Sequence, residues 1–320
     1  MFKPQIQKTK ILLIIAFINV LLVLFVANSK TYIKQPNFDM RVESTNHMNE
    51  LINSVKQMDG IFIEDLDYYN SGLVGRLNSH ITSKVDSTII DSKIITTHPH
   101  FAAFIVYLLE DLDLNPGDDV AIAMSGSFPG ANIALLSACK AMGIVPIIIT
   151  SVGGSEWGAI DSNFTWLDLE NSLFDSGVIS HRSKAVSLGG YSDMFDKNPE
   201  NGYGGPEGKR LAERAIKRNG IKRIVNDKKE RVSDREEIYK KNINDQLLAN
   251  YSAFVNIGGG VGSIGIKGKT TYGWGILDIN KVAADERGYN MSGIIKEFAK
   301  NNVHLINIQQ INKMIKDDDG

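Results

Sequence analysis

The chain has 320 residues, of which 43% are hydrophobic and 22% are charged, and its formal net charge at pH 7 is −2. This balance is ordinary for a globular protein and excludes fibrous and intrinsically disordered classes. Cys139 is the only cysteine, which excludes an intrachain disulfide. Its apolar surroundings favour a buried structural thiol over a nucleophile.

An apolar segment near the N-terminus predicts a membrane anchor. Residues 11–27 carry no charge and one polar side chain, Asn19. As a helix rising 1.5 Å per residue, this segment spans roughly 25 Å, close to the roughly 30 Å hydrocarbon core of a bilayer. No other charge-free apolar segment is as long. The alternative is a cleavable signal peptide, for which Ala27 and Ser29 offer a small-x-small site.

The charges around this segment predict its orientation. Three lysines precede it and two follow it, namely Lys3, Lys8 and Lys10, then Lys30 and Lys34. The excess before the segment favours a cytoplasmic location for residues 1–10. Residues 28–45 are polar and contain Pro36, which is typical of a stalk. We therefore expect a single-pass protein of the cell membrane with residues 46–320 as an extracytoplasmic domain.

The first part of that domain has the apolar spacing of helices. Hydrophobic side chains recur at helical spacing over residues 48–58 and again over 101–109, before Asn115-Pro116-Gly117 interrupts the pattern. We predict two helices that pack an apolar stripe on the core.

A βαβ unit follows and sets the fold class. Residues 119–124 and 145–150 are apolar without alternation, which is typical of parallel strands buried on both faces. Between them lie a glycine-containing loop, 125–130, and a helical segment, 131–143. The alternation continues to the C-terminus, with strands predicted at 183–189, 221–225, 252–259 and 303–308 and helices at 165–177, 206–220, 233–249 and 291–301. The predicted fold is α/β, with a mostly parallel, Rossmann-like sheet flanked by helices.

Ligands of such sheets bind beyond the carboxyl ends of the strands, so the loops there are the candidate sites. In the first loop we predict ligand contacts through backbone N–H groups and side chains at Ser125, Gly126, Ser127, Gly130 and Asn132. Ser127 is also a candidate nucleophile. However, the glycines do not have the spacing of a nucleophile elbow, and helix capping is the more ordinary role of such serines.

The second loop adds a carboxylate and an indole. We expect Gly153, Gly154, Ser155 and Trp157 to contact the ligand, with Glu156 as a candidate general acid or base. A surface carboxylate and a core tryptophan explain the same residues equally well.

The third and fourth loops contribute Gly190 and Gly259 as ligand contacts, and Asp193 as a candidate base or a simple turn residue. Residues 260–265 match the dinucleotide fingerprint, but the residues after them lack helical periodicity, so we predict no nucleotide cofactor. His98 and His100 have no matching ligand cluster, so we predict no metal site.

Positive charge is concentrated in residues 209–231. This segment holds ten Lys or Arg residues against three acidic residues, a net of +7 that leaves −9 for the remainder of the chain. It is either a solvated helix and loop with Glu213 paired to Lys217, or a docking face for a polyanion. Nucleic acid is not expected as the partner outside the cell.

Several long segments resemble one bacterial family. Residues 98–112 and 117–159, with LGGYSDM at 188–194 and FVNIGGG at 254–260, are similar to the poly-γ-glutamate system protein family. The resemblance implies a membrane-associated component of the apparatus that makes, exports or processes poly-γ-glutamate, with the polymer or its precursor and other subunits as partners.

Three hypotheses follow for the role of the chain. In the first, the loops bind glutamate carboxylates while the basic segment guides the polymer. In the second, the chain is a γ-glutamyl hydrolase or transferase that uses Ser127 or Asp193 activated by Glu156. In the third, it is a scaffold that holds synthase subunits through its membrane helix.

Overall fold

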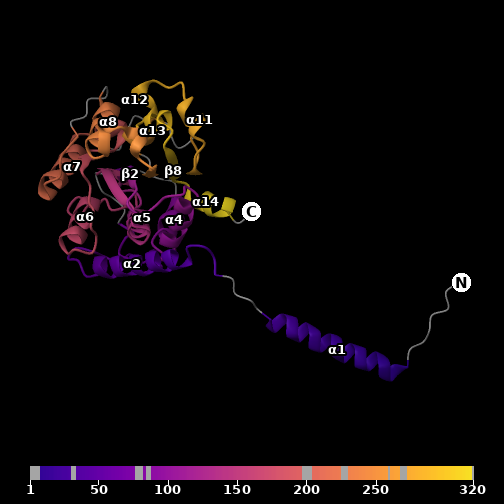
Figure 1. Ribbon diagram of the computed structural model, residues 1–320. Helices are drawn as coiled ribbons and strands as arrows, with labels where there is room; N and C mark the ends of the chain where they lie inside the picture. Colours follow the sequence, from indigo (N-terminus) through magenta and orange to yellow (C-terminus); the bar gives the residue numbers. More distant parts are fainter. Residues whose placement is uncertain are drawn as a thin grey trace. The chain divides into compact units, whose positions relative to one another are not determined.

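A computed structural model describes the protein over residues 8–29, 34–75, 82–83, 88–196, 204–224, 230–258, 260–266 and 272–318 (Figure 1). The chain divides into two units, Met1–Phe38 and Asp39–Gly320. The first unit contains helix α1, Thr9–Asn28, whose 20 residues include the predicted apolar segment. Among the described residues it is the one helix long and apolar enough to cross a membrane.

The second unit is an α/β domain, as predicted. Its main sheet has six strands in the order β5-β3-β2-β6-β8-β7. Five strands are parallel: β2 (Asp119–Ser125), β3 (Val145–Ser151), β5 (Ala185–Ser187), β6 (Ala253–Ile257) and β8 (His304–Ile308). The edge strand β7 (Gly275–Ile276) runs antiparallel to β8. A second, two-stranded sheet pairs β1 (Thr82–Ser83) with β4 (Gly154–Ser155).

Helices cover both faces of the main sheet (Figure 1). Alternate residues of β2 face opposite sides: Ile122 packs in one apolar cluster, and Ala121 and Ala123 pack in the other. The cluster around Ile122 includes α2 (Phe38–Lys56), α4 (His100–Glu110), α5 (Pro129–Met142), α6 (Trp166–Asp175), α7 (Pro206–Asn219) and α14 (Ile311–Asp318). The other cluster includes α8 (Arg231–Lys241), α11 (Ile279–Ala283) and α13 (Ile295–Lys300). Short helices α3 (Thr88–Ile95), α9 (Val261–Ile264) and α12 (Tyr289–Ser292) complete the domain.

Helix α2 starts inside the segment assigned to a stalk, so that assignment is wrong for residues 38–45. The side chain of Arg41 forms an ion pair with Glu110 of α4, with Nε 3.2 Å from Oε1, and its guanidinium lies 5.3 Å from the ring centroid of Tyr107. These contacts join residues far apart in the sequence. The polar composition of residues 38–45 therefore gave no local sign of the helix.

Three predicted elements are shorter than expected. Over the described residues 221–224, the strand predicted at 221–225 forms a single bridge, between Arg223 and Val186. The helix predicted over 233–249 ends at Lys241 and is followed by two 3-10 turns, the first of which contains Asp245 with a positive φ of 57°. The helix predicted near 291–301 is divided into α12 and α13 at Gly293, whose φ is 76°.

A carboxyl group is buried where α6 packs on the sheet. Glu170 is fully buried, and its carboxylate accepts hydrogen bonds from the Ser183 N–H (3.2 Å) and the Ser183 hydroxyl (3.0 Å). Burial raises the pKa of Glu170 from its ordinary 4.5 to about 7, because the charged form loses its water. The folded state therefore retains a proton that the unfolded chain has lost between these pH values.

This shift predicts a pH-dependent stability. The contribution of protonated Glu170 is complete below pH 4.5 and is lost as the pH rises through 7. The free energy of unfolding should fall by about 3 kcal/mol across that window through this group. In Glu170→Gln the amide stays neutral at every pH, so urea unfolding followed at several pH values should show a flatter profile. Identical pH profiles for the two proteins would contradict the assignment.

Candidate functional site

The strand order places a candidate site at the carboxyl ends of β2 and β6. Strands β3 and β5 lie on one side of β2, and β6 and β8 lie on the other. The connections after β2 and β6 therefore leave the sheet in opposite directions, the topological switch point at which parallel sheets bind ligands. The predicted loops that follow β2, β3, β5 and β6 all begin at this edge of the sheet.

At the switch point the two loops are in direct contact. The hydroxyl of Ser125, at the end of β2, lies 3.5 Å from the carbonyl oxygen of Ile257 in β6. Gly258 has a positive φ of 89°, which favours glycine, and a side chain there would overlap with the Ser125 hydroxyl. Gly259, another predicted ligand contact, lies outside the described residues. The switch point is thus filled by small residues.

The predicted glycines bring the loops together by close backbone packing. A Cβ atom at Gly154 would lie 2.7 Å from the carbonyl carbon of Gly126, and one at Gly153 would lie 2.7 Å from the nitrogen of Gly190. A Cβ atom at Gly130 would lie 2.6 Å from the carbonyl oxygen of Thr96. The faces of these glycines are therefore occupied by neighbouring backbone.

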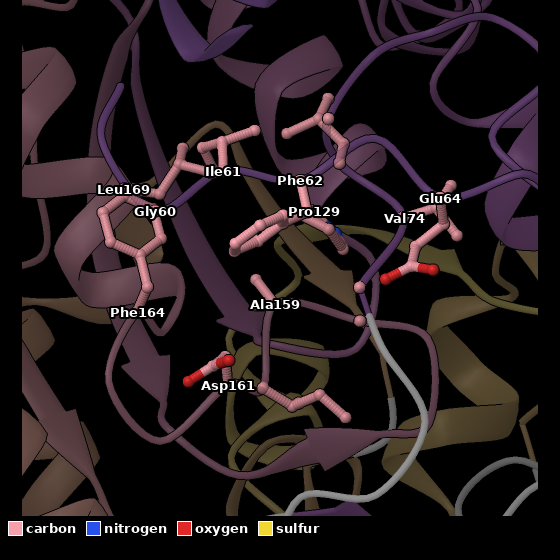
Figure 2. Close-up of a pocket in the computed structure, with 15 residues that line it drawn as sticks. Gly60, Ile61, Phe62, Glu64, Val74, Pro129, Ala159, Asp161, Phe164 and Leu169 are labelled. Atoms are coloured by element: carbon pink, nitrogen blue, oxygen red, sulfur yellow. The ribbon is translucent and has the colours of Figure 1, made fainter. Parts of the chain in front are cut away.

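A small pocket of about 60 Å³ opens beside these loops. Figure 2 shows Phe62, Pro129 and Ala159 around it, with the carboxyl groups of Glu64 and Asp161 at its sides. This volume is small beside the roughly 300 Å³ of ordinary ligand sites, and its two carboxyl groups disfavour an anion. Its lining includes neither the glycines predicted to bind ligand nor any other predicted site residue.

A buried lysine that sequence reasoning missed connects two of the predicted serines. Lys93 of α3 is 2% exposed, and its Nζ donates hydrogen bonds to the carbonyl oxygen of Ser127 and, over 2.9 Å, to Oγ of Ser155. The N–H of Ser155 donates to Oγ of Ser127 over 3.1 Å. Nζ also lies 4.4 Å from the ring centroid of Phe128. Ser127 and Ser155 therefore both contact the amino group of Lys93.

Asp193 lies in a second polar cluster, at the ends of β3 and β5. It is fully buried and forms an ion pair with Arg235 of α8, whose Nη2 lies 2.6 Å from Oδ2. Ser187 donates to the other carboxylate oxygen over 2.8 Å, and its hydroxyl lies 2.9 Å from that of Ser151. This ion pair occupies the carboxylate that was a candidate base.

The remaining predicted residues take different positions. Glu156 is buried, and Trp157 is partly buried with a positive φ of 66°, which is uncommon for a residue other than glycine. The side-chain nitrogen of Asn132 donates to the carbonyl oxygen of Ser125 over 3.0 Å. Among the described residues, no group donates a hydrogen bond to the buried amide oxygens of Asn132 and Gln309. They remain available as acceptors at this edge of the sheet.

Two motifs rejected on sequence grounds have structural roles. The rings of His98 and His100 contact each other with centroids 4.8 Å apart, and the described residues contain no group of three potential metal ligands. Gly262 of the glycine-rich segment lies against the guanidinium of Arg235, where a side chain would overlap with it. This glycine therefore serves the buried ion pair.

The described part of the basic segment is largely the outer face of α7. Arg210 pairs with Glu207 at 2.6 Å, Arg223 pairs with Glu213 at 2.9 Å, and Arg218 pairs with Asp168 of α6. Glu213 thus pairs with Arg223 instead of the expected Lys217. Three further cations, Arg214, Lys217 and Lys222, are exposed and form no ion pair with a described residue.

Comparison of the chain with protein-family models, with curated proteins and with solved structures found no match.

Proposed function

We propose that the chain is a membrane-anchored component of a poly-γ-glutamate system whose domain binds the acidic polymer along α7. The observation that carries this proposal is the exposed set of Arg214, Lys217 and Lys222, which form no ion pair with an acidic group of the described residues. The identity of the polymer rests on the resemblance of residues 98–112 and 117–159 to that family.

The geometry of α7 suits a repeating polyanion. Arg210, Arg214 and Lys217 follow one another at spacings of four and three residues, so they lie along one face of the helix. From the first to the last they extend over roughly 10 Å. A polymer with one carboxylate per residue can contact several of these cations at once. Because each contact is exposed, binding should weaken as salt is added.

Helix α1 supports the membrane location within this proposal. Residues 11–27 would anchor the chain, residues 1–10 would remain in the cytoplasm, and the domain would meet the polymer outside the cell. Other subunits of the synthesis or export complex are the expected partners within the membrane. Nucleic acid is not an expected partner in that compartment.

Binding can be tested with fluorescently labelled poly-γ-glutamate and the full chain in detergent. The variant Arg214→Gln/Lys217→Gln/Lys222→Gln should bind about tenfold more weakly at low salt, because each exposed contact contributes modestly and three are lost. Fluorescence anisotropy measures the affinity, and the salt dependence of binding should be less steep in the variant.

A matched control removes the same charge elsewhere. Lys56, Lys140 and Lys281 are exposed and lie on other helices. Their replacement by glutamine should leave the affinity within about twofold of wild type, because only net charge changes. Equal weakening in both triple variants would show nonspecific attraction and contradict binding along α7.

A further inference from the structure

Lys93 and Ser155 have the arrangement that serine nucleophiles require of a base. Nζ of Lys93 lies 2.9 Å from Oγ of Ser155, within range for direct proton transfer. The two residues come from different elements, α3 and β4, and are 62 positions apart in the sequence. Both are buried, with Lys93 almost without access to solvent.

Burial suits the lysine to act as a base. Lysines in buried positions serve as bases in enzymes. The distance between Nζ and Oγ is compatible with a hydrogen bond in either direction. A charged ammonium donates to the hydroxyl, and a neutral amine accepts from it. In the second case the remaining N–H groups still donate to the carbonyl oxygen of Ser127.

Ser127 has a different position from Ser155. The contact of Lys93 with Ser127 is to the backbone carbonyl oxygen. Oγ of Ser127 instead accepts the N–H of Ser155, which fixes the backbone that carries the second hydroxyl. Ser127 is therefore a positioning residue, and Ser155 is the hydroxyl placed for activation.

We propose that Ser155 is the nucleophile of an acyl-transfer reaction at an amide bond, with Lys93 as its general base. The γ-glutamyl amide of the polymer is the substrate that follows if the proposed function holds. The pocket lies close to the backbone of Ser155, because Gly158, which lines it, donates its N–H to the carbonyl oxygen of Ser155 over 3.1 Å. The pocket offers room for a small group next to the scissile bond.

The reaction balances with water as the second reactant. Oγ of Ser155 forms a bond to the amide carbonyl carbon while its proton passes to the neutral amine of Lys93. The C–N bond then breaks, and Lys93 returns that proton to the leaving amine. Water, with its proton taken by Lys93, attacks the resulting ester; the bond from the acyl carbon to Oγ breaks, a carboxylic acid is released, and Lys93 returns the proton to Oγ of Ser155. An amine in place of water gives transfer.

A fluorophosphonate probe tests the nucleophile without any polymer. The full chain in detergent should be labelled once, at Ser155, as read by intact mass and peptide mapping. Ser155→Ala should abolish labelling, and Ser137→Ala, which removes a buried serine of α5, should not change it. A folded wild-type chain that stays unlabelled at Ser155 would overturn the proposal, and this outcome depends on no variant.

Substitutions of Lys93 test whether it acts as the general base. Lys93→Arg keeps a cation with hydrogen-bond donors but cannot act as a base, because arginine stays protonated. Its labelling rate should fall at least a hundredfold, a loss typical of removing a general base. Lys93→Met should behave alike, and thermal unfolding shows whether each variant is folded. Labelling of folded Lys93→Arg at the wild-type rate would refute Lys93 as the base.

The polymer reaction separates this inference from the proposed function. The Arg214→Gln/Lys217→Gln/Lys222→Gln variant should be labelled by the probe at the wild-type rate even if it binds polymer weakly. Incubation of the wild-type chain with poly-γ-glutamate should shorten the polymer, with one new amine and one new carboxylate per cleavage, and Ser155→Ala should not. Labelling of Ser155 with unchanged polymer length would support the nucleophile and overturn the polymer as its substrate.

Discussion

Replacing Asp193 with alanine should lower the free energy of unfolding by about 3–5 kcal/mol. Asp193 is 0% exposed and its partner Arg235 is 3% exposed, so the variant leaves a buried guanidinium without its counter-charge. The Ser187 hydroxyl also loses its acceptor. Urea unfolding followed by tryptophan fluorescence measures the effect, because all three tryptophans lie in the second unit.

A double variant and a surface pair provide the controls. Asp193→Leu/Arg235→Met removes both charges and should recover much of the lost stability, since replacing a whole buried pair is far less harmful than breaking it. Glu237→Ala breaks a pair with Lys241 whose side chains are 63% and 57% exposed, and it should change stability little. If Asp193→Ala were as mild as Glu237→Ala, the pair would not hold these loops together.

Gly158→Ala should destabilise the domain by more than about 3 kcal/mol. A Cβ atom at this position would overlap with the carbonyl oxygen of Gly126 and would lie 2.9 Å from that of Ser127. Both contacts are with backbone, which cannot rotate away as a side chain can. The loop that carries Ser155 would have to shift, so probe labelling at Ser155 should fall together with stability.

Gly288→Ala is the matched control for this substitution. Gly288 has a φ of −57°, and an added Cβ atom would meet nothing within 4 Å. Alanine there should leave stability unchanged or raise it slightly, because it restricts the unfolded chain. Thermal unfolding of both variants compares them directly. A Gly158→Ala variant as stable as Gly288→Ala would show that the loop contacts are loose.

The two proposals assign different surfaces to different tasks. In the first proposal, the exposed cations Arg214, Lys217 and Lys222 attract an extended polyanion; in the second, the reaction takes place at Lys93 of α3 and Ser155 of β4, which are buried. The pocket beside Ser155 bears the carboxyl groups of Glu64 and Asp161, which oppose the entry of an anion. If both proposals hold, the affinity for the polymer depends on α7. The entry of an amide group to Ser155 is then a step that follows polymer binding.

The sequence by itself determined the parts of this protein that depend on neighbouring residues. The charge-free segment at 11–27 predicted the N-terminal helix. The two continuous apolar segments on either side of residues 131–143 predicted parallel strands joined by a helix. These signals are local, because hydrophobic spacing reflects which side of one element is buried. The fold class therefore followed from the order of the elements.

Only the tertiary structure decided which polar groups meet. Lys93 is one of two charged residues in the short helix α3, and nothing near it in the sequence identifies Ser155 as its partner. In the sequence Asp193 resembles a turn residue, whereas in the structure it contacts Arg235, which is 42 positions away. Such pairs form where packing forces separate segments together, and the free energy of burying a charge then selects its partner. That selection leaves no periodic pattern in the chain.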